Sequence, residues 1–136
     1  MSITNQEVIN QALLEINVIE DGDSANADQS SDTLQKLNQM MAEWAVSDKD
    51  LHFFPQSDLT DVCPIPIWAE DGVVNNLAVK CAPSFAFAVS ALLYEKAKSG
   101  SNVIARTCMN LKLKNTDMSH LPAGNGYRSN ILTDSL

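Results

Sequence analysis

The side chains that could perform acid–base chemistry are few and scattered along the chain. There are two histidines, His52 and His120, and neither stands in a metal-helix or nucleophile motif. Glu43 is the one acid beside a predicted helical core, where burial would raise its pKa toward that of a general acid. A glycoside hydrolase needs two carboxylates at a fixed separation, and a solvated helix edge is the simpler interpretation of Glu43. The sequence therefore predicts neither a catalytic residue nor an enzyme.

Metal ligands are also poorly arranged. Asp21, Asp23 and Asp28 resemble a calcium loop, but Asp32 stands where the closing glutamate belongs and the glycine is displaced. The cysteines are three, widely spaced and without a C-x-x-C pair: Cys63, Cys81 and Cys108. Neither a zinc site nor a disulfide framework is indicated. We expect Cys81 and Cys108 to pack as small apolar residues on helix faces, and we expect no cofactor.

Charge is divided unevenly between the two halves of the chain. The net charge is −8 over 136 residues, with 14 acids and 2 bases in residues 1–71 but 3 acids and 7 bases in residues 72–136. A two-ended molecule suits a protein with different neighbours at each end, although uneven sorting of surface charge explains the division equally well. The length indicates one domain, and the longest apolar run is too short for a membrane span. The N-terminus has no secretory signal pattern.

Helical spacing of apolar residues recurs along most of the chain, and the elements that would position any site are therefore helices. Thr4 and Glu7 form a capping box that starts a first helix, which fades near Asn17. A second helix is expected over residues 27–46. Its apolar positions share one broad face: Leu34, Leu37, Met41 and Trp44.

Residues 47–66 have no helical period and contain the sequence Cys63-Pro64-Ile65-Pro66, which favours an extended path. A connection this long in a small domain is often a binding loop. Its large apolar residues are Phe53, Phe54, Leu59 and Ile65. They either fold back onto the core, which is the preferred interpretation, or contact a partner.

Three further helices are expected over residues 67–82, from Pro83 to about Lys98, and over residues 102–114. Ser99-Gly100-Ser101 is the predicted stop and turn between the last two. Such a pair could pass for a helix-turn-helix, with lysines and arginine contacting phosphates. An acidic chain, with a sequence pI near 4.5, argues against a dedicated DNA-binding protein. Basic faces could instead line a DNA channel, and the candidates are Arg106, Lys112 and Lys114.

After residue 116 the helical pattern ends, and isolated apolar residues stand in a polar tail. That composition suits an arm that orders on binding a partner. The chain is therefore predicted to be all-α: a small bundle of about five helices over residues 1–114 with an extended C-terminal arm over residues 115–136. Arg128, Ile131 and Leu132 are arm contacts by chemistry alone.

Three short segments, in fixed order, carry a family resemblance. They are Leu37-Asn38-Gln39-Met40-Met41-Ala42-Glu43-Trp44, Leu77-Ala78-Val79-Lys80-Cys81-Ala82-Pro83-Ser84-Phe85-Ala86 and Leu121-Pro122-Ala123-Gly124-Asn125-Gly126. With a proline-containing loop between the first two, the set resembles the head-completion adaptors (tail accessory factors) of short-tailed phages, of the Salmonella type. The likeness covers residues 34–130. The end after Asn130 is shorter than expected for close relatives, and the loop before the third helix differs in composition.

The resemblance implies a virion structural protein at the head–tail junction. Twelve copies would form a ring under the portal, close the head after DNA packaging, and offer a platform for the tail hub (nozzle) and fibres. The implied partners are the portal ring, those tail proteins, neighbouring copies and genome DNA in the channel. By similarity the portal-binding arm includes Leu121, Pro122, Gly124, Gly126 and Tyr127. The acidic half, with the loop from Phe53 to Ile65, is the candidate tail-facing side. The alternative from the residues alone is a small helical regulator that binds DNA or a host protein.

Overall fold

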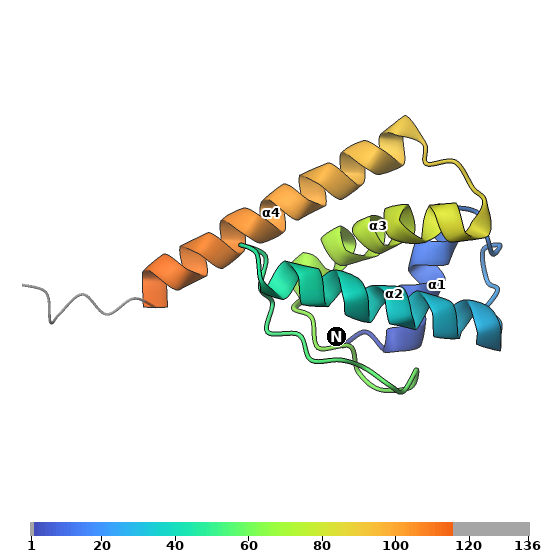
Figure 1. Cartoon of the computed structure of the whole chain (residues 1–136), viewed down its shortest axis with the longest axis horizontal. Helices are drawn as coiled ribbons and strands as arrows, with labels where there is room; N and C mark the ends of the chain where they lie inside the picture. Colours follow the sequence, from blue (N-terminus) through green and yellow to red (C-terminus); the bar gives the residue numbers. More distant parts are fainter. Residues whose placement is uncertain (1, 116–136) are drawn as a thin grey trace, which may run out of the picture.

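The computed structural model describes residues 2–115, and this part of the chain is helical with no named strand. The α-helices are α1 (Asn5–Glu15), α2 (Ala27–Ala45), α3 (Glu70–Cys81) and α4 (Ala91–Asn115). Two short 3-10 turns, η1 (Ile67–Ala69) and η2 (Ala82–Phe85), bracket α3. Figure 1 shows α1, α2 and α3 gathered into a body, while α4 lies along α3 and continues beyond the body. The all-α prediction is confirmed for the described residues.

The first two helices begin where their side chains can cap them. Thr4 Oγ1 accepts from the backbone N–H of Glu7 at 3.3 Å, and Glu7 Oε2 accepts from the Thr4 N–H at 2.7 Å. The predicted capping box is confirmed. Helix α2 has a second one, between Asn26 and Gln29, that the sequence analysis did not identify. The predicted apolar face of α2 is buried, from Leu34 to Trp44.

The helix predicted from Pro83 is wrong. Pro83 stands inside η2, and that turn closes at Ala86, whose backbone is left-handed with φ of 58°. Four residues then connect to α4, which starts at Ala91 after Ser90 Oγ accepts from the N–H of Leu93. The helix predicted from Pro83 would bury Ala86, Leu92 and Leu93 on one face. Because α4 starts eight residues later, Ala86 and Leu92 are exposed, while Leu93 is buried.

The predicted stop at Ser99-Gly100-Ser101 is also wrong, because α4 runs through it without interruption. Gly100 allows a close helix crossing here: a Cβ built on it would lie 2.6 Å from the Cα of Gly72 in α3. The glycine therefore serves packing between helices rather than helix termination. Four α-helices replace the expected five, and the helix-turn-helix interpretation loses its turn.

The core lies between α1, α2 and α3 and is closed on one side by α4, over the stretch from Leu93 to Cys108. Ile9, Leu13, Leu37, Leu77 and Ile104 are its largest fully buried apolar side chains. Ile104 and Cys108 are the last buried residues of α4 in the described chain, so the helix leaves the body after Cys108. Seven helical residues follow, which extend α4 by roughly 10 Å.

Candidate assembly surface

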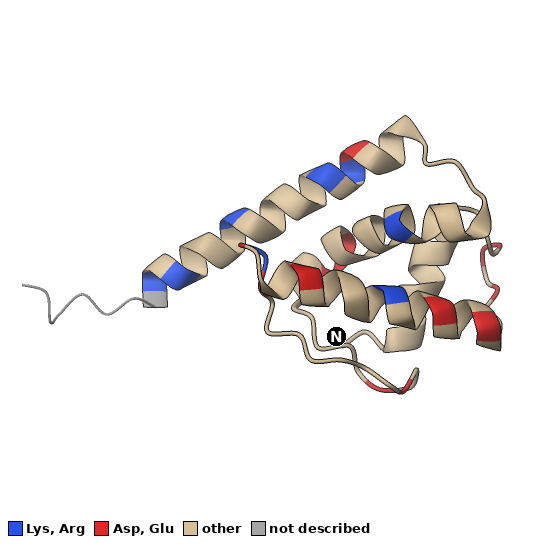
Figure 2. Ribbon diagram, in the orientation of Figure 1, with Lys and Arg blue, Asp and Glu red and all other residues tan. Residues whose placement is uncertain are grey.

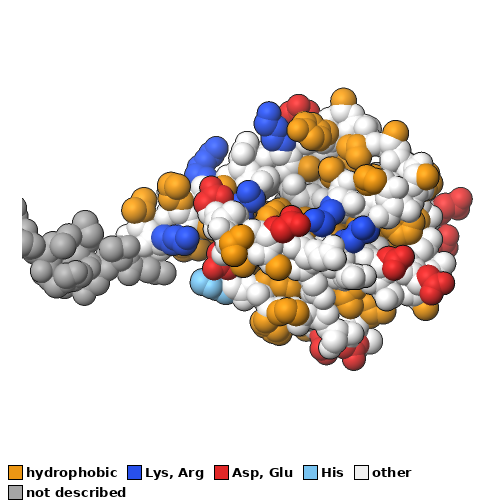
Figure 3. Space-filling view, viewed as in Figure 1, with side chains coloured by type: hydrophobic (Ala, Val, Ile, Leu, Met, Phe, Trp, Pro, Cys, Tyr) orange, Lys and Arg blue, Asp and Glu red, His pale blue; other side chains and the backbone are white. Residues whose placement is uncertain are grey.

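The projecting end of α4 combines exposed apolar and basic side chains. We call residues 106–114 the α4 tip. Its apolar members are Met109, Leu111 and Leu113, with exposed fractions of 54%, 46% and 69%. Arg106, Lys112 and Lys114 are exposed on the same segment. Figure 3 shows orange and blue side chains side by side where the helix leaves the body.

The buried stripe of α4 continues onto the tip but has less to pack against there. Leu93, Ala97, Ile104 and Cys108 are buried, whereas Leu111, three residues further on, is half exposed. Helical spacing in the sequence predicts that Val103 and Leu111 pack in the core, but both are exposed. Lys112 and Lys114 in the last turn stabilise the helix end through its dipole.

A groove of about 660 Å³ lies in the angle between the tip and the body. Trp68, in η1, is 41% exposed and forms its wall opposite Leu111, with His52 and Lys112 also lining it. The Sγ of Cys108 lies 3.5 Å from the backbone carbonyl oxygen of Asp50, to which it donates. That contact joins α4 to the start of the long loop at the groove. Trp68 was predicted to lie within a continuous helix. It lies instead in the 3-10 turn η1, which begins after Pro66 and precedes α3.

His52 stands at the rim of this groove with a left-handed backbone, φ of 56°. Its N–H donates to Asp50 Oδ1 at 2.8 Å, and its ring Nδ1 lies 3.8 Å from Asp50 Oδ2. The side chain is 92% exposed, so it is placed in water and not in an enclosed site. His120 lies outside the described residues.

The loop over residues 46–66 is fastened to the body by a polar clasp around Gln56. The Gln56 N–H donates to Asn38 Oδ1 at 2.9 Å, and Asn38 Nδ2 donates to the Gln56 carbonyl at 2.8 Å. Buried Asn5 donates through Nδ2 to Gln56 Oε1 at 3.0 Å and to the Asp58 carbonyl at 2.7 Å. Sequence analysis missed this clasp, because its partners are 18 and 51 residues apart and no motif links them.

The predicted loop residues divide between core and surface. Phe53, Leu59 and Ile65 are partly buried and pack against the core, as the preferred interpretation expected. Phe54 points outward with 61% of its surface exposed. The clasp therefore holds a loop on which Phe54 is available to a partner, as are the exposed side chains of Val46 and Val62.

Arg106, Lys112 and Lys114 are all on α4, but they do not share one face. At about 100° per residue, Arg106 and Lys112 point roughly 120° apart around the helix. Figure 2 shows basic residues spaced along α4 and acidic residues concentrated on other elements. The structure therefore brings the three bases to one segment and separates their directions.

The predicted arm residues lie outside the described part of the chain. They are Leu121, Pro122, Gly124, Gly126, Tyr127, Arg128, Ile131 and Leu132. The described chain ends at Asn115 in α4, so the arm starts at the α4 tip.

Groups suited to metal binding do not converge in the described residues. Glu43 is exposed and pairs with Lys80, Oε1 to Nζ at 3.1 Å. Over residues 2–115, no group of three or more His, Cys, Asp or Glu side chains could hold a metal ion. Cys63, Cys81 and Cys108 are free and buried, and burial raises the pKa of each thiol, to about 12 for Cys63 and about 11 for Cys81. Within the same residues, no helix is long and apolar enough to cross a membrane.

The sequence was also compared with known protein families. The family model described as P22 tail accessory factor matches residues 1–135. That range includes all four helices and the predicted arm. No curated protein matches the chain.

Proposed function

Since the chain belongs to the P22 tail accessory factor family, a family of phage tail-associated structural proteins, we propose that it is the adaptor between portal and tail. In this proposal copies gather as a ring of twelve under the portal after the genome is packaged. The ring closes the head and carries the tail hub and fibres. Structural families of this kind are typically not enzymes.

The observation that carries the proposal is the α4 tip. A helix that leaves its own body with Leu111 and Leu113 exposed offers apolar surface that a free protomer does not cover. The arm follows Asn115 in the sequence, and the tip before it points away from the body. Segments of this kind gain their packing on a partner. We propose that the portal ring receives the arm.

The exposed Phe54 and the acids of its loop are the proposed tail-facing features. Asp58 and Asp61 flank the loop's turn and are exposed. The backbone and side-chain hydrogen bonds from Thr60 lower the pKa of Asp58, so this carboxylate stays charged to lower pH than an ordinary one. A tail protein that binds here would present cationic side chains around an apolar pocket for Phe54.

The regulator alternative is weakened by the fold. A helix-turn-helix needs two helices at a steep angle, and α4 is one helix through Ser99–Ser101. The acidic residues also outnumber the basic ones on the body as a whole. We therefore keep DNA contact as an outcome to be tested and not as a second proposal.

Native mass spectrometry of the protein, alone and mixed with purified portal ring, tests the proposal. We expect a monomer alone and a defined multimer on the portal. Deleting residues 117–136 should abolish portal binding and leave the helical body folded, because the core is built from residues within α1 to α4 and their connections. Deleting only residues 133–136 is the matched control and should bind. Portal binding by the longer deletion would contradict the arm assignment, and a stable free dimer indifferent to portal would contradict the adaptor function.

A further inference from the structure

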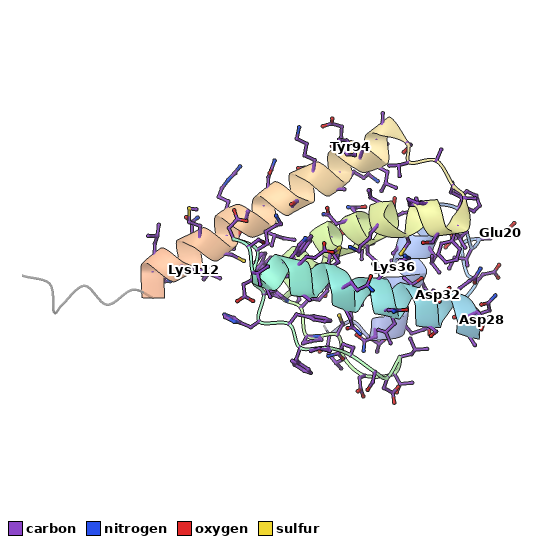
Figure 4. The ribbon with its side chains drawn as sticks, in the orientation of Figure 1. Glu20, Asp28, Asp32, Lys36, Tyr94 and Lys112 are labelled. Atoms are coloured by element: carbon purple, nitrogen blue, oxygen red, sulfur yellow. The ribbon has the colours of Figure 1, made fainter. Side chains whose placement is uncertain are left out.

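The α4 tip has a chemical opposite on the same molecule. The link between α1 and α2 and the first turns of α2 carry a group of exposed acids, which we call the acidic end. Its members are Glu20, Asp21, Asp23, Asp28 and Asp32. Lys36, one turn after Asp32, is the base nearest to them in the sequence. Figure 4 labels Glu20, Asp28 and Asp32 at one end of the long axis and Lys112 at the other.

The acidic end, Arg106 and Lys114 have no ion pair within residues 2–115. The ion pairs within residues 2–115 are Lys49–Asp48, His52–Asp50, Lys80–Glu43 and Lys96–Glu15. None of them includes a member of the acidic end, Arg106 or Lys114. The five acids, Arg106 and Lys114 therefore keep their charges available for another molecule.

Exposed apolar side chains also lie at both ends of the molecule. At the tip these side chains are Met109, Leu111 and Leu113. The connection before α4 lies at the same end of the molecule as the α1–α2 link, and it carries Phe87, which is 43% exposed. Partly buried Val18 and Ile19 pack against the core within the α1–α2 link itself. Apolar residues rimmed by opposite charges are the usual composition of a protein interface.

The charges determine which ends can pair. Two acidic ends repel one another, and so do two tips, so a symmetric contact through either end is disfavoured. The favourable pairing joins the tip of one copy to the acidic end of the next. A contact between two different patches can repeat from copy to copy, head to tail, and such a series closes into a ring when its rotation permits.

We propose that the α4 tip of one copy docks on the acidic end of a neighbouring copy. This inference rests on the proposed ring function, and it names the surfaces through which copies would meet. Arg106 and Lys114 supply the charges, and Leu113 supplies apolar area. The observations favour a protein partner over DNA, because large exposed apolar residues alternate with the bases and the bases point in different directions around α4. A surface that follows DNA phosphates is more polar than this one.

Zero-length carbodiimide cross-linking tests the contact without portal. The reagent joins a lysine amine to a carboxylate only when the two are in ion-pair contact. An equal mixture of ¹⁵N-labelled and unlabelled full-length protein, at low salt and high concentration, should give mixed-isotope peptides that join Lys112 or Lys114 to the acidic end. We expect these links to fall at least about tenfold in 0.5 M salt, because the ion pairs are exposed.

Charge-reversal variants locate the contact. Arg106→Glu with Lys114→Glu should remove the links of the parent protein. Lys98→Glu, an equivalent change at an exposed α4 position outside the tip, should leave them. Mixing the Arg106→Glu/Lys114→Glu variant with an Asp28→Lys/Asp32→Lys variant should restore association, because the reversed tip then meets a reversed acidic end. Circular dichroism melts of each variant control for folding, which we expect to be unchanged because all these side chains are exposed.

The outcomes separate this inference from the adaptor function. Absence of intermolecular links, or links that persist after Arg106→Glu/Lys114→Glu, would overturn it. Salt-dependent retention of the protein on duplex DNA, lost in that variant and without copy-to-copy links, would assign the tip to DNA instead. Normal multimers of the same double variant on the portal would overturn the head-to-tail contact and leave the adaptor function standing. Failure of the parent protein to bind portal would contradict the adaptor function itself.

Discussion

Gly72 of α3 and Gly100 of α4 lie in backbone contact at the crossing of the two helices. A Cβ on Gly100 would come within 2.6 Å of the Gly72 Cα, and a Cβ on Gly72 would lie 3.1 Å from the Gly100 carbonyl oxygen. Helices α3 and α4 make the most extensive helix pairing of the described chain. The absence of both side chains allows this proximity, and it sets the direction in which α4 leaves the body.

Replacing Gly100 by alanine should therefore destabilise the protein. Alanine gains up to about 1 kcal/mol in helix propensity, but here its methyl group meets backbone that cannot move independently. We expect the overpacking to outweigh that gain and to lower the free energy of unfolding by about 1–2 kcal/mol in urea titrations. Ser99→Ala, at an exposed position of the same turn, is the matched control and should be neutral or stabilising. A more stable Gly100→Ala protein would show that the helices do not cross here.

Removing the donor at the centre of the loop clasp should loosen the loop. Asn5→Ala leaves Gln56 Oε1 and the Asp58 carbonyl without their donor in a buried setting. We expect a loss of about 1–3 kcal/mol in unfolding free energy and faster hydrogen exchange at the Gln56 amide. Gln11→Ala, exposed on the same helix, should change neither quantity. Unchanged exchange at Gln56 in Asn5→Ala would mean that the Asn38 contacts alone hold the loop.

Polar substitution at the tip should separate assembly from folding. Leu113 is 69% exposed, so Leu113→Asp should change the unfolding free energy by less than about 0.5 kcal/mol. We expect the same change to weaken multimer formation on the portal by at least about tenfold, measured by native mass spectrometry. Leu92→Asp is the control, since Leu92 is 68% exposed on the same helix at its other end. Equal effects of the two substitutions would show that the tip has no special role.

The buried thiols should make stability depend on alkaline pH. Burial raises the pKa of Cys63 to about 12, with a further contribution from the charge of Glu70, against 9.0 for an ordinary thiol. The folded protein therefore holds this proton at pH values where the unfolded chain releases it. The resulting stabilisation is complete below pH 9 and is lost as the pH rises from 9 toward 12. Urea titrations between pH 8 and 10.5 should show a shallower decline for Cys63→Ala than for the parent protein. Parallel declines would mean that Cys63 is less buried than the structure indicates.

Local signals in the sequence predicted the first half of the fold well. The Thr4–Glu7 capping box and the Leu34–Trp44 stripe depend on residues within a few turns of one another, and both are confirmed. The second half was predicted less well, because its decisive contacts are distant in sequence. Gly100, between two serines, has the local sequence of a helix end. Only its contact with Gly72, 28 residues earlier, explains why it lies in the middle of a helix. Pro83 is compatible with the first position of a helix, and only the left-handed backbone of Ala86 shows that the helix does not continue from it.

The candidate surface shows the same division. Arg106, Lys112 and Lys114 are exposed to solvent, as their residue types predict, because lysine and arginine are rarely buried. Composition could not show that Leu111 is exposed beside them, since Leu111 follows Cys108 at the three-residue spacing of a buried stripe. Where the body ends is a tertiary property, set by the lengths of α1, α2 and α3. The clasp around Gln56 was not predicted for a related reason, because amide side chains carry no pattern that specifies a distant partner.

Because α4 is unbroken, it fixes the distance and direction from the body to the point where the arm begins. Ile104 and Cys108 fix the helix to the body, and Asn115 is carried at a set distance and angle from them. Each residue inserted between Cys108 and Asn115 would advance the start of the arm by about 1.5 Å and turn it by about 100°. A change in the length of this segment therefore also rotates the direction in which the arm leaves the helix. Evolution can lengthen this segment without redirecting the arm only in steps close to whole helical turns.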